Sequence, residues 1–200
     1  GTRRVGMREI TEGVGAAFLA VRTGVAKGGP KPVLIAPGTR ERFVAAGRGA
    51  TAEDLRRRSP VPLDWPDDEG WRALPFLFDE SELLFFGDDR TAGKMGESVR
   101  TCEEWVAECE ADGGSVWPKF IANPLTGNMA PKRSGIGETL RGDGCVAAHR
   151  FAVAESDGMS IEDQLAFWAG CPSLPVAMLT FSGSKSIHAL VRVDCSDAAE

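Results

Sequence analysis

TFSGSKSIHALVRVD, residues 180 to 194, carries the pattern around which the rest of the chain is arranged. The apolar run Val176 to Phe181 leads into a Ser/Gly-rich turn. After the turn the residues alternate between two faces, with Ile187, Ala189, Val191 and Val193 on one and His188, Leu190, Arg192 and Asp194 on the other. A period of two is typical of a β-strand. The stretch therefore predicts strands over 176–181 and 187–194, joined by the loop SGSKS.

One interpretation of this loop is a phosphate-binding turn. Gly183 is free to adopt positive φ, and the backbone amides, the hydroxyls and Lys185 are suited to face a polyphosphate. His188, in the first residues of the following strand, adds a further donor. The loop is not a P-loop, because a Walker A sequence has glycine directly before its lysine and a helix after it. For the loop alone, a solvated hairpin turn is the alternative.

Two acidic residues, Glu155 and Asp157, follow the mostly apolar run 146–154. In an extended chain, residues two apart point to the same side with their Cα atoms roughly 6.6 Å apart. Carboxylate oxygens are the ligands that Mg²⁺ and Mn²⁺ prefer. The pair is a candidate metal site, although two acids at a strand end are also common as plain surface residues.

Together the two motifs resemble motifs one and two of the archaeo-eukaryotic primase superfamily, which includes plasmid and phage primase-polymerases and the polymerase domain of bacterial DNA ligase D. The resemblance covers residues 146–194: an acid-x-acid at a strand end, a helix, a strand, then SGSKSIH entering another strand. It implies that Glu155 and Asp157 are catalytic metal ligands, with Glu155 standing where the family usually has Asp. It also implies a nucleotide-binding set that consists of Ser182, Lys185, Ser186 and His188, of which His188 also belongs to the catalytic set.

The function implied by the resemblance is that of a DNA primase or polymerase, which transfers nucleotides from nucleoside triphosphates in DNA replication. Its cofactor would be Mg²⁺ or Mn²⁺, and its partner a DNA template, single-stranded or primed. The family has a third carboxylate, but Asp194 lies about 20 Å along the strand from His188. We therefore expect the third acid beyond Glu200, in a longer protein that continues, for example, into a helicase, in cis or in trans.

Two alternatives from other classes stay open. One is a non-catalytic DNA-binding or replication-initiation module that keeps the fold. The other is a metal-dependent nuclease or phosphohydrolase that uses Glu155 and Asp157 on water, with Lys185 and His188 on a phosphate.

The order of elements predicts an α+β fold. The resemblance implies an RRM-like primase-polymerase core over residues 81–200, incomplete at its C-terminal end, after an N-terminal α/β module and connector over residues 1–80. Capping boxes predict where helices begin. They open helices from Thr51 to Arg58 and over 102–111, and Ser160 with Asp163 caps a helix over 161–168. Further expected elements are a helix over 7–23 and strands over 32–36, 82–86 and 115–122.

Residues 123–145 form a Gly/Pro/Asn-rich stretch that predicts a long loop, and compact domains seldom keep such loops without a function. We expect it to contact template or nucleotide, with Arg141 as its principal cation; a flexible surface loop is equally consistent.

The amino-acid composition limits the classes of function that are expected but does not indicate one. The 200 residues carry a net charge of −6, which is unusual for a nucleic-acid-binding domain, although cations gather locally at 56–58, at 132–133, at Arg141, and at Lys185 with Arg192. Five irregularly spaced cysteines predict reduced thiols and a cytoplasmic protein. A zinc site built from Cys102, Cys109, Cys145 and His149 has poor ligand spacing. No apolar run approaches a membrane span, so no membrane partner is expected.

Overall fold

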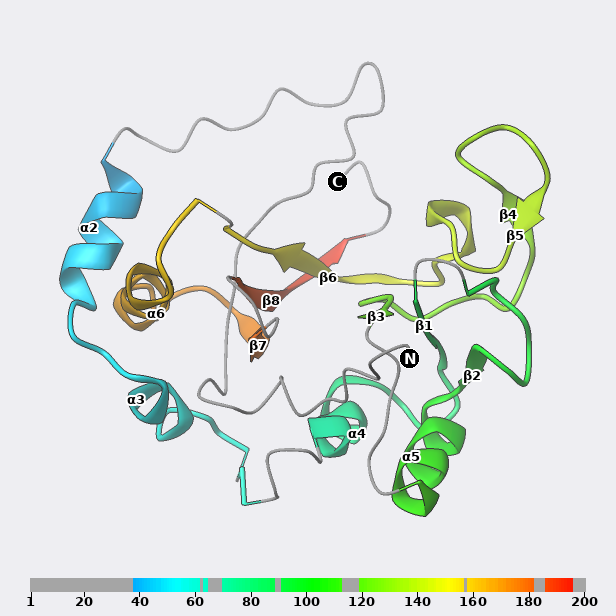
Figure 1. Ribbon diagram of the computed structural model, residues 1–200, viewed down its shortest axis with the longest axis horizontal. Helices are drawn as coiled ribbons and strands as arrows, with labels where there is room; N and C mark the ends of the chain where they lie inside the picture. The colour runs from blue at the N-terminus through cyan, green and yellow to red at the C-terminus, as the bar shows by residue number, and fades with distance from the viewer. Residues whose placement is uncertain are drawn as a thin grey trace, which may run out of the picture.

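The computed structural model describes residues 38–61, 63–64, 70–88, 91–112, 119–156, 158–181 and 186–195. Within these ranges helices are combined with three small antiparallel sheets, which confirms the predicted α+β class (Figure 1). The predicted helix over 7–23 and strand over 32–36 lie outside the described residues. No helix in the described ranges has both the length and the apolar character needed to cross a membrane.

The sheet that contains the two motifs has the strand order β6-β8-β7. Its strands are β6 (His149–Ala154), β7 (Val176–Phe181) and β8 (Ile187–Cys195), and both outer strands pair antiparallel with β8. Helix α6 (Ile161–Gly170) connects β6 to β7. Strands β6 and β7 therefore run in the same direction with β8 between them, which is a split β-α-β unit. The sequence predicted β7 with its observed bounds, and β8 to within one residue.

Each face of this sheet contributes to a different core. Ile187, Ala189 and Val191 point to one side, where they pack with Trp168 of α6. On the opposite face, Leu190 joins a cluster that lies between this sheet and the next one. The alternation read from the sequence thus reflects burial on both faces, because a strand in the middle of a sheet is covered from two sides.

The second sheet has the order β2-β1-β3, from β1 (Leu83–Gly87), β2 (Val99–Thr101) and β3 (Lys119–Phe120). Helix α5 (Cys102–Ala111) covers it, and its Trp105 donates a hydrogen bond from Nε1 to the Leu84 carbonyl at 3.1 Å. The short helices η1 (Gly70–Ala73) and α4 (Leu74–Leu77) pack into the same core, and Trp71 is 3% exposed there.

The helices α2 (Thr39–Ala46) and α3 (Ala52–Arg56) lie along α6. Glycine makes the approach possible at two positions: a Cβ atom on Gly47 would lie 1.9 Å from the Ala166 carbonyl oxygen, and one on Gly170 would lie 2.0 Å from the Phe43 oxygen. Leu55 of α3 enters the same core as Ile187. Residues before position 81 therefore contribute to the cores that the two sheets form.

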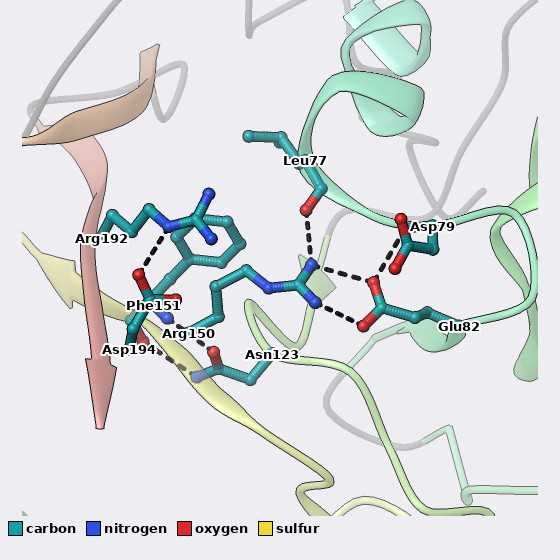
Figure 2. Close-up of polar contacts among 8 residues, drawn as sticks. All are labelled: Leu77, Asp79, Glu82, Asn123, Arg150, Phe151, Arg192 and Asp194. Atoms are coloured by element: carbon teal, nitrogen blue, oxygen red, sulfur yellow. Dashed lines mark hydrogen bonds and ion pairs between the residues drawn. The ribbon is translucent and has the colours of Figure 1, made fainter. Parts of the chain in front are cut away.

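A polar cluster links β6 to the segment before β1 (Figure 2). Arg150 donates two hydrogen bonds to the carboxylate of Glu82, which raises the pKa of the guanidinium, and a third to the Leu77 carbonyl at 2.8 Å. Beside it, the Asn123 side chain donates to the Phe151 carbonyl at 2.9 Å and accepts from the Phe151 amide at 2.8 Å. The start of β6 is thus fixed on both sides by side chains from other elements.

Both predicted capping boxes are present, at Thr51 with Asp54 and at Thr101 with Glu104. The predicted strand over 115–122 is seen only as β3, since 113–118 lie outside the described residues. The prediction that 123–145 is one long loop was wrong. It contains a hairpin of β4 (Ala130–Pro131) and β5 (Glu138–Thr139) and the turn η2 (Asp143–Cys145).

Candidate functional site

Both motifs lie at the same edge of the β6-β8-β7 sheet. Ala154, the last residue of β6, pairs with Ala189, and Phe181, the last residue of β7, pairs with Ile187. The chain therefore leaves β6 and β7, and enters β8, at the same edge of the sheet. Antiparallel pairing with a shared central strand produces this placement, although 32 residues of sequence separate Ala154 from Ser186.

Glu155 and His188 form the described centre of this edge. The Nε2 atom of His188 lies 3.5 Å from Oε2 of Glu155, a distance at which a protonated imidazole and a carboxylate form an ion pair. Their side chains are 41% and 42% exposed, so both are open to a ligand from solvent. The structure thus places together one residue from each predicted motif.

Gln164 of α6 connects the two segments from beneath. Its side chain is 1% exposed; its Nε2 donates to the Met159 carbonyl at 2.8 Å, and its Oε1 accepts from the Ile187 amide at 2.9 Å. Met159 follows the acidic segment, and Ile187 follows the SGSKS loop. The buried carboxamide of Gln164 therefore holds both segments in place. Removing such a group is costly, because its buried partners lose a hydrogen bond and cannot replace it with one to water.

The sequence analysis missed Gln164, although a signal exists. Gln164 lies at helical spacing with Ile161, Leu165 and Trp168, so it belongs to the apolar stripe of α6. A glutamine within an apolar stripe indicates a buried amide that must be hydrogen-bonded.

Thr180 lies directly across from His188 in the β7–β8 register. Its Oγ1 atom is buried and has no hydrogen-bond partner in the described part of the chain. Residues paired directly across an antiparallel ladder share a face. A hydroxyl with capacity for a further hydrogen bond thus lies next to His188.

The other predicted site residues divide into two groups. Asp157, Ser182 and Lys185 lie outside the described residues, so their predicted roles stay predictions. Ser186 is described and is buried, with 2% of its surface exposed, and its predicted nucleotide contact stays a prediction.

Several cations that the sequence marked as available are bound within the fold. Arg141 donates to the Asp88 carbonyl at 2.9 Å and lies 5.3 Å from the Phe85 ring centroid, so it anchors the hairpin, and its expected contact with a template stays a prediction. Arg58 donates to the Ala169 carbonyl at 2.8 Å. Arg192 pairs with Asp194 at 2.7 Å, at the end of β8 opposite to His188 (Figure 2).

Three of the four residues considered for a zinc site are cysteines that lie in the cores, and the fourth, His149, begins β6. Cys102 and Cys109 are each 1% exposed in one core, and Cys145 is fully buried in another. Cys145 donates from its thiol to the Thr139 carbonyl at 3.1 Å. All five cysteines are described, and none forms a disulfide.

For a divalent metal, the donor chemistry of the edge is suitable, since Glu155 presents an exposed carboxylate of the kind that Mg²⁺ and Mn²⁺ bind. Among the described residues, which do not include Asp157, no group of three or more His, Cys, Asp or Glu side chains comes close enough to hold a metal ion. The fit therefore depends on Glu155 acting together with Asp157.

Comparison of the chain with protein-family models, with curated proteins and with solved structures finds no match. Function is therefore inferred from the residues of this edge and from the way the sheet brings them together.

Proposed function

We propose that this chain is a metal-dependent nucleotidyltransferase domain of the primase-polymerase type, which acts on nucleoside triphosphates and DNA. The observation that carries the proposal is the 3.5 Å approach of Glu155 to His188 at the edge where the acidic segment and the SGSKS loop leave the sheet. In such a site the carboxylate binds a metal and the imidazole binds a phosphate of the same nucleotide, so the two side chains must lie close together.

The split β-α-β unit supports the same proposal. The order β6-β8-β7 with a helix between β6 and β7 corresponds to the first four elements of a β-α-β-β-α-β fold of ferredoxin-like or RRM-like type. Both faces of the middle strand are covered by cores here, so in this proposal the nucleotide binds at the edge where β6 and β7 end.

In this proposal, each residue has a separate task. Glu155 and Asp157 hold Mg²⁺ or Mn²⁺, which when bound would activate a 3′-hydroxyl and stabilise the pyrophosphate leaving group. His188, Ser182 and Lys185 bind and orient the triphosphate through charge and hydrogen bonds, because positioning supplies much of the rate in phosphoryl transfer. Gln164 keeps the two segments in register.

Calorimetric titration with a nucleoside triphosphate in the presence of Mn²⁺ tests the proposal. We expect binding by the unaltered chain, weakened at least tenfold by Glu155→Gln and by His188→Gln, since each removes a charged contact that contributes about 1.5–3 kcal/mol. The matched controls are Glu138→Gln, an exposed acid on β5, and His149→Gln at the other end of β6. The proposal fails if the unaltered chain binds no nucleotide, or if the site variants bind as the controls do.

Turnover separates the proposed enzyme from its alternatives. A labelled primer-template incubated with Mn²⁺ and nucleotides should lengthen, and Asp157→Ala should abolish the lengthening. Strand shortening without nucleotides would indicate a nuclease instead. Nucleotide and DNA binding with neither product would indicate a non-catalytic module.

A further inference from the structure

The β4–β5 hairpin ends in a tip, residues 131–138, that stands clear of the cores. Every residue from Pro131 to Glu138 is exposed, whereas Ala130 and Leu140 at the base of the hairpin are only 7% and 6% exposed. Figure 1 shows the loop of the hairpin extending beyond β4 and β5 at the periphery of the molecule. The tip is thus available to a partner, while the base belongs to the fold.

The base of the hairpin is held firmly. Ala130, Leu140 and Cys145 pack in a core cluster. The Cys145 thiol donates to the Thr139 carbonyl at 3.1 Å, and Arg141 donates to the Asp88 carbonyl at 2.9 Å. A tip on such a base is presented in one orientation, which lowers the entropy lost when it binds.

An apolar side chain stands at the apex of this tip. Ile136 is 80% exposed, the most of any large apolar side chain in the part of the chain that the structure describes. Its neighbours Gly135 and Gly137 have φ angles of 76° and 78°, in the region that favours glycine. The backbone therefore turns on both sides of Ile136 and projects it into solvent, where an apolar surface of this size is unfavourable.

Two cations, Lys132 and Arg133, accompany the apolar apex. Both are exposed, and within the described ranges neither side chain makes a hydrogen bond or an ion pair. This differs from Arg57, Arg150 and Arg192, each of which pairs with a carboxylate. In a chain with a net charge of −6, the tip is a local positive site with free donors.

We propose that residues 131–138 form a DNA-contacting wedge, in which Lys132 and Arg133 bind phosphates and Ile136 enters a base step of duplex DNA. Proteins that kink DNA insert single apolar side chains between base pairs and place cations on nearby phosphates. A single apolar side chain offers too little area for a stable protein interface, which buries about 1,000 Å² or more. It also offers too little for lasting insertion into a membrane.

The proposed wedge depends on the proposed function in one respect, which is that DNA is taken to be the partner. The hairpin and the Glu155–His188 edge lie at opposite ends of β6, which spans roughly 17 Å between its first and last Cα atoms (Figure 1). The two sites can therefore be altered separately.

The wedge is tested by binding the whole chain to duplex DNA that carries 2-aminopurine. The fluorescence of 2-aminopurine reports the unstacking of bases, and a series of salt concentrations reports the number of phosphate contacts. Ile136→Ser should abolish the fluorescence rise and lower affinity by about tenfold. Lys132→Gln with Arg133→Gln should reduce the slope of log K against log salt by about 1.8, which is about 0.9 for each lost phosphate contact. The controls are Phe76→Ser, which removes an exposed apolar side chain elsewhere, and Arg42→Gln with Arg48→Gln, which removes the same charge from exposed positions near α2.

The proposal is overturned if the unaltered chain does not bind the duplex, or if Ile136→Ser binds and unstacks it as the unaltered chain does. It is also overturned if the chain binds vesicles of anionic lipid in preference to DNA and the tip variants reduce that binding. Nucleotide binding with Mn²⁺, measured on the same tip variants, should be unchanged. A chain that binds no nucleotide would contradict the proposed function but leave the duplex result to decide the wedge.

Discussion

The imidazole of His188 and the carboxylate of Glu155 lie 3.5 Å apart, although Glu155 follows β6 and His188 lies in β8, with a helix and a third strand between them in the chain. Strand β8 causes this approach by inserting between β6 and β7, which aligns the residue after Ala154 with the second residue of β8. The pair therefore depends on the register of the sheet and on the elements that fix it.

The first prediction concerns Gln164, whose side chain helps to fix this register. Replacing it with methionine keeps the volume but leaves the Ile187 amide and the Met159 carbonyl without partners. We expect a loss of about 1–3 kcal/mol in the free energy of unfolding, measured by urea denaturation. Glu162→Met, at an exposed position of the same helix, should cost less than about 1 kcal/mol.

A role for Gln164 in positioning predicts more than lost stability. Under conditions where Gln164→Met is fully folded, nucleotide binding with Mn²⁺ should still be weakened, because the two segments are no longer held in register. Equal nucleotide affinity in Gln164→Met and the unaltered chain would limit Gln164 to a structural role.

The contact between α2 and α6 makes a second prediction. In Gly170→Ala the new Cβ atom would lie 2.0 Å from a backbone oxygen, that of Phe43, so the helices must separate. Overpacking of this kind costs about 1–3 kcal/mol or more. Gly158→Ala, whose Cβ atom would meet nothing within 4 Å, should change the unfolding free energy by less than about 0.5 kcal/mol. Similar melting temperatures for the two variants would contradict the observed packing.

The buried thiols make stability depend on alkaline pH. Burial, together with the nearby charge of Glu82, raises the pKa of Cys102 from 9.0 to about 11. Burial and Asp112 raise the pKa of Cys109 from 9.0 to about 12. Between the unfolded and folded values the unfolded chain has lost protons that the folded chain keeps, so stability falls as pH rises.

We therefore expect these thiols to leave the free energy of unfolding, measured by urea denaturation, unaffected below about pH 9 and to lower it from there towards pH 11, by up to about 1.4 kcal/mol per pH unit for each thiol. The double variant Cys102→Ala with Cys109→Ala should start from a lower stability and fall less steeply. A variant that falls as steeply as the unaltered chain would assign the alkaline loss to other groups.

Helix N-termini were predictable from the sequence because their signals are local. Thr101 and Glu104 satisfy each other's backbone amides, so four residues suffice to locate the start of α5. Strand β7 was equally accessible, because an apolar run of six residues that ends at a Ser/Gly-rich sequence is shorter than most helices.

The β4–β5 hairpin and the hydrogen bonds between distant segments were not predictable in the same way. Strands of two residues in a Gly-rich segment, such as β4 and β5, show no periodicity. The role of Arg141 depends on Asp88 and Phe85, which lie more than fifty positions earlier in the chain, and no local pattern announces such a contact. Only the family resemblance implied that Glu155 and His188 share a site, and their distance required the register of the sheet.

The two histidines provide the most direct measurement of the central claim, that a metal and a nucleotide bind at the Glu155–His188 edge. In proton NMR the ring signals of His149 and His188 are assigned with His149→Gln and His188→Gln, and Mn²⁺ is added below one equivalent with a nucleoside triphosphate. We expect the His188 signals to broaden first while those of His149, at the far end of β6, remain sharp, and the difference to disappear in Glu155→Gln. Equal broadening of both histidines, or none at His188, would contradict a metal site at this edge.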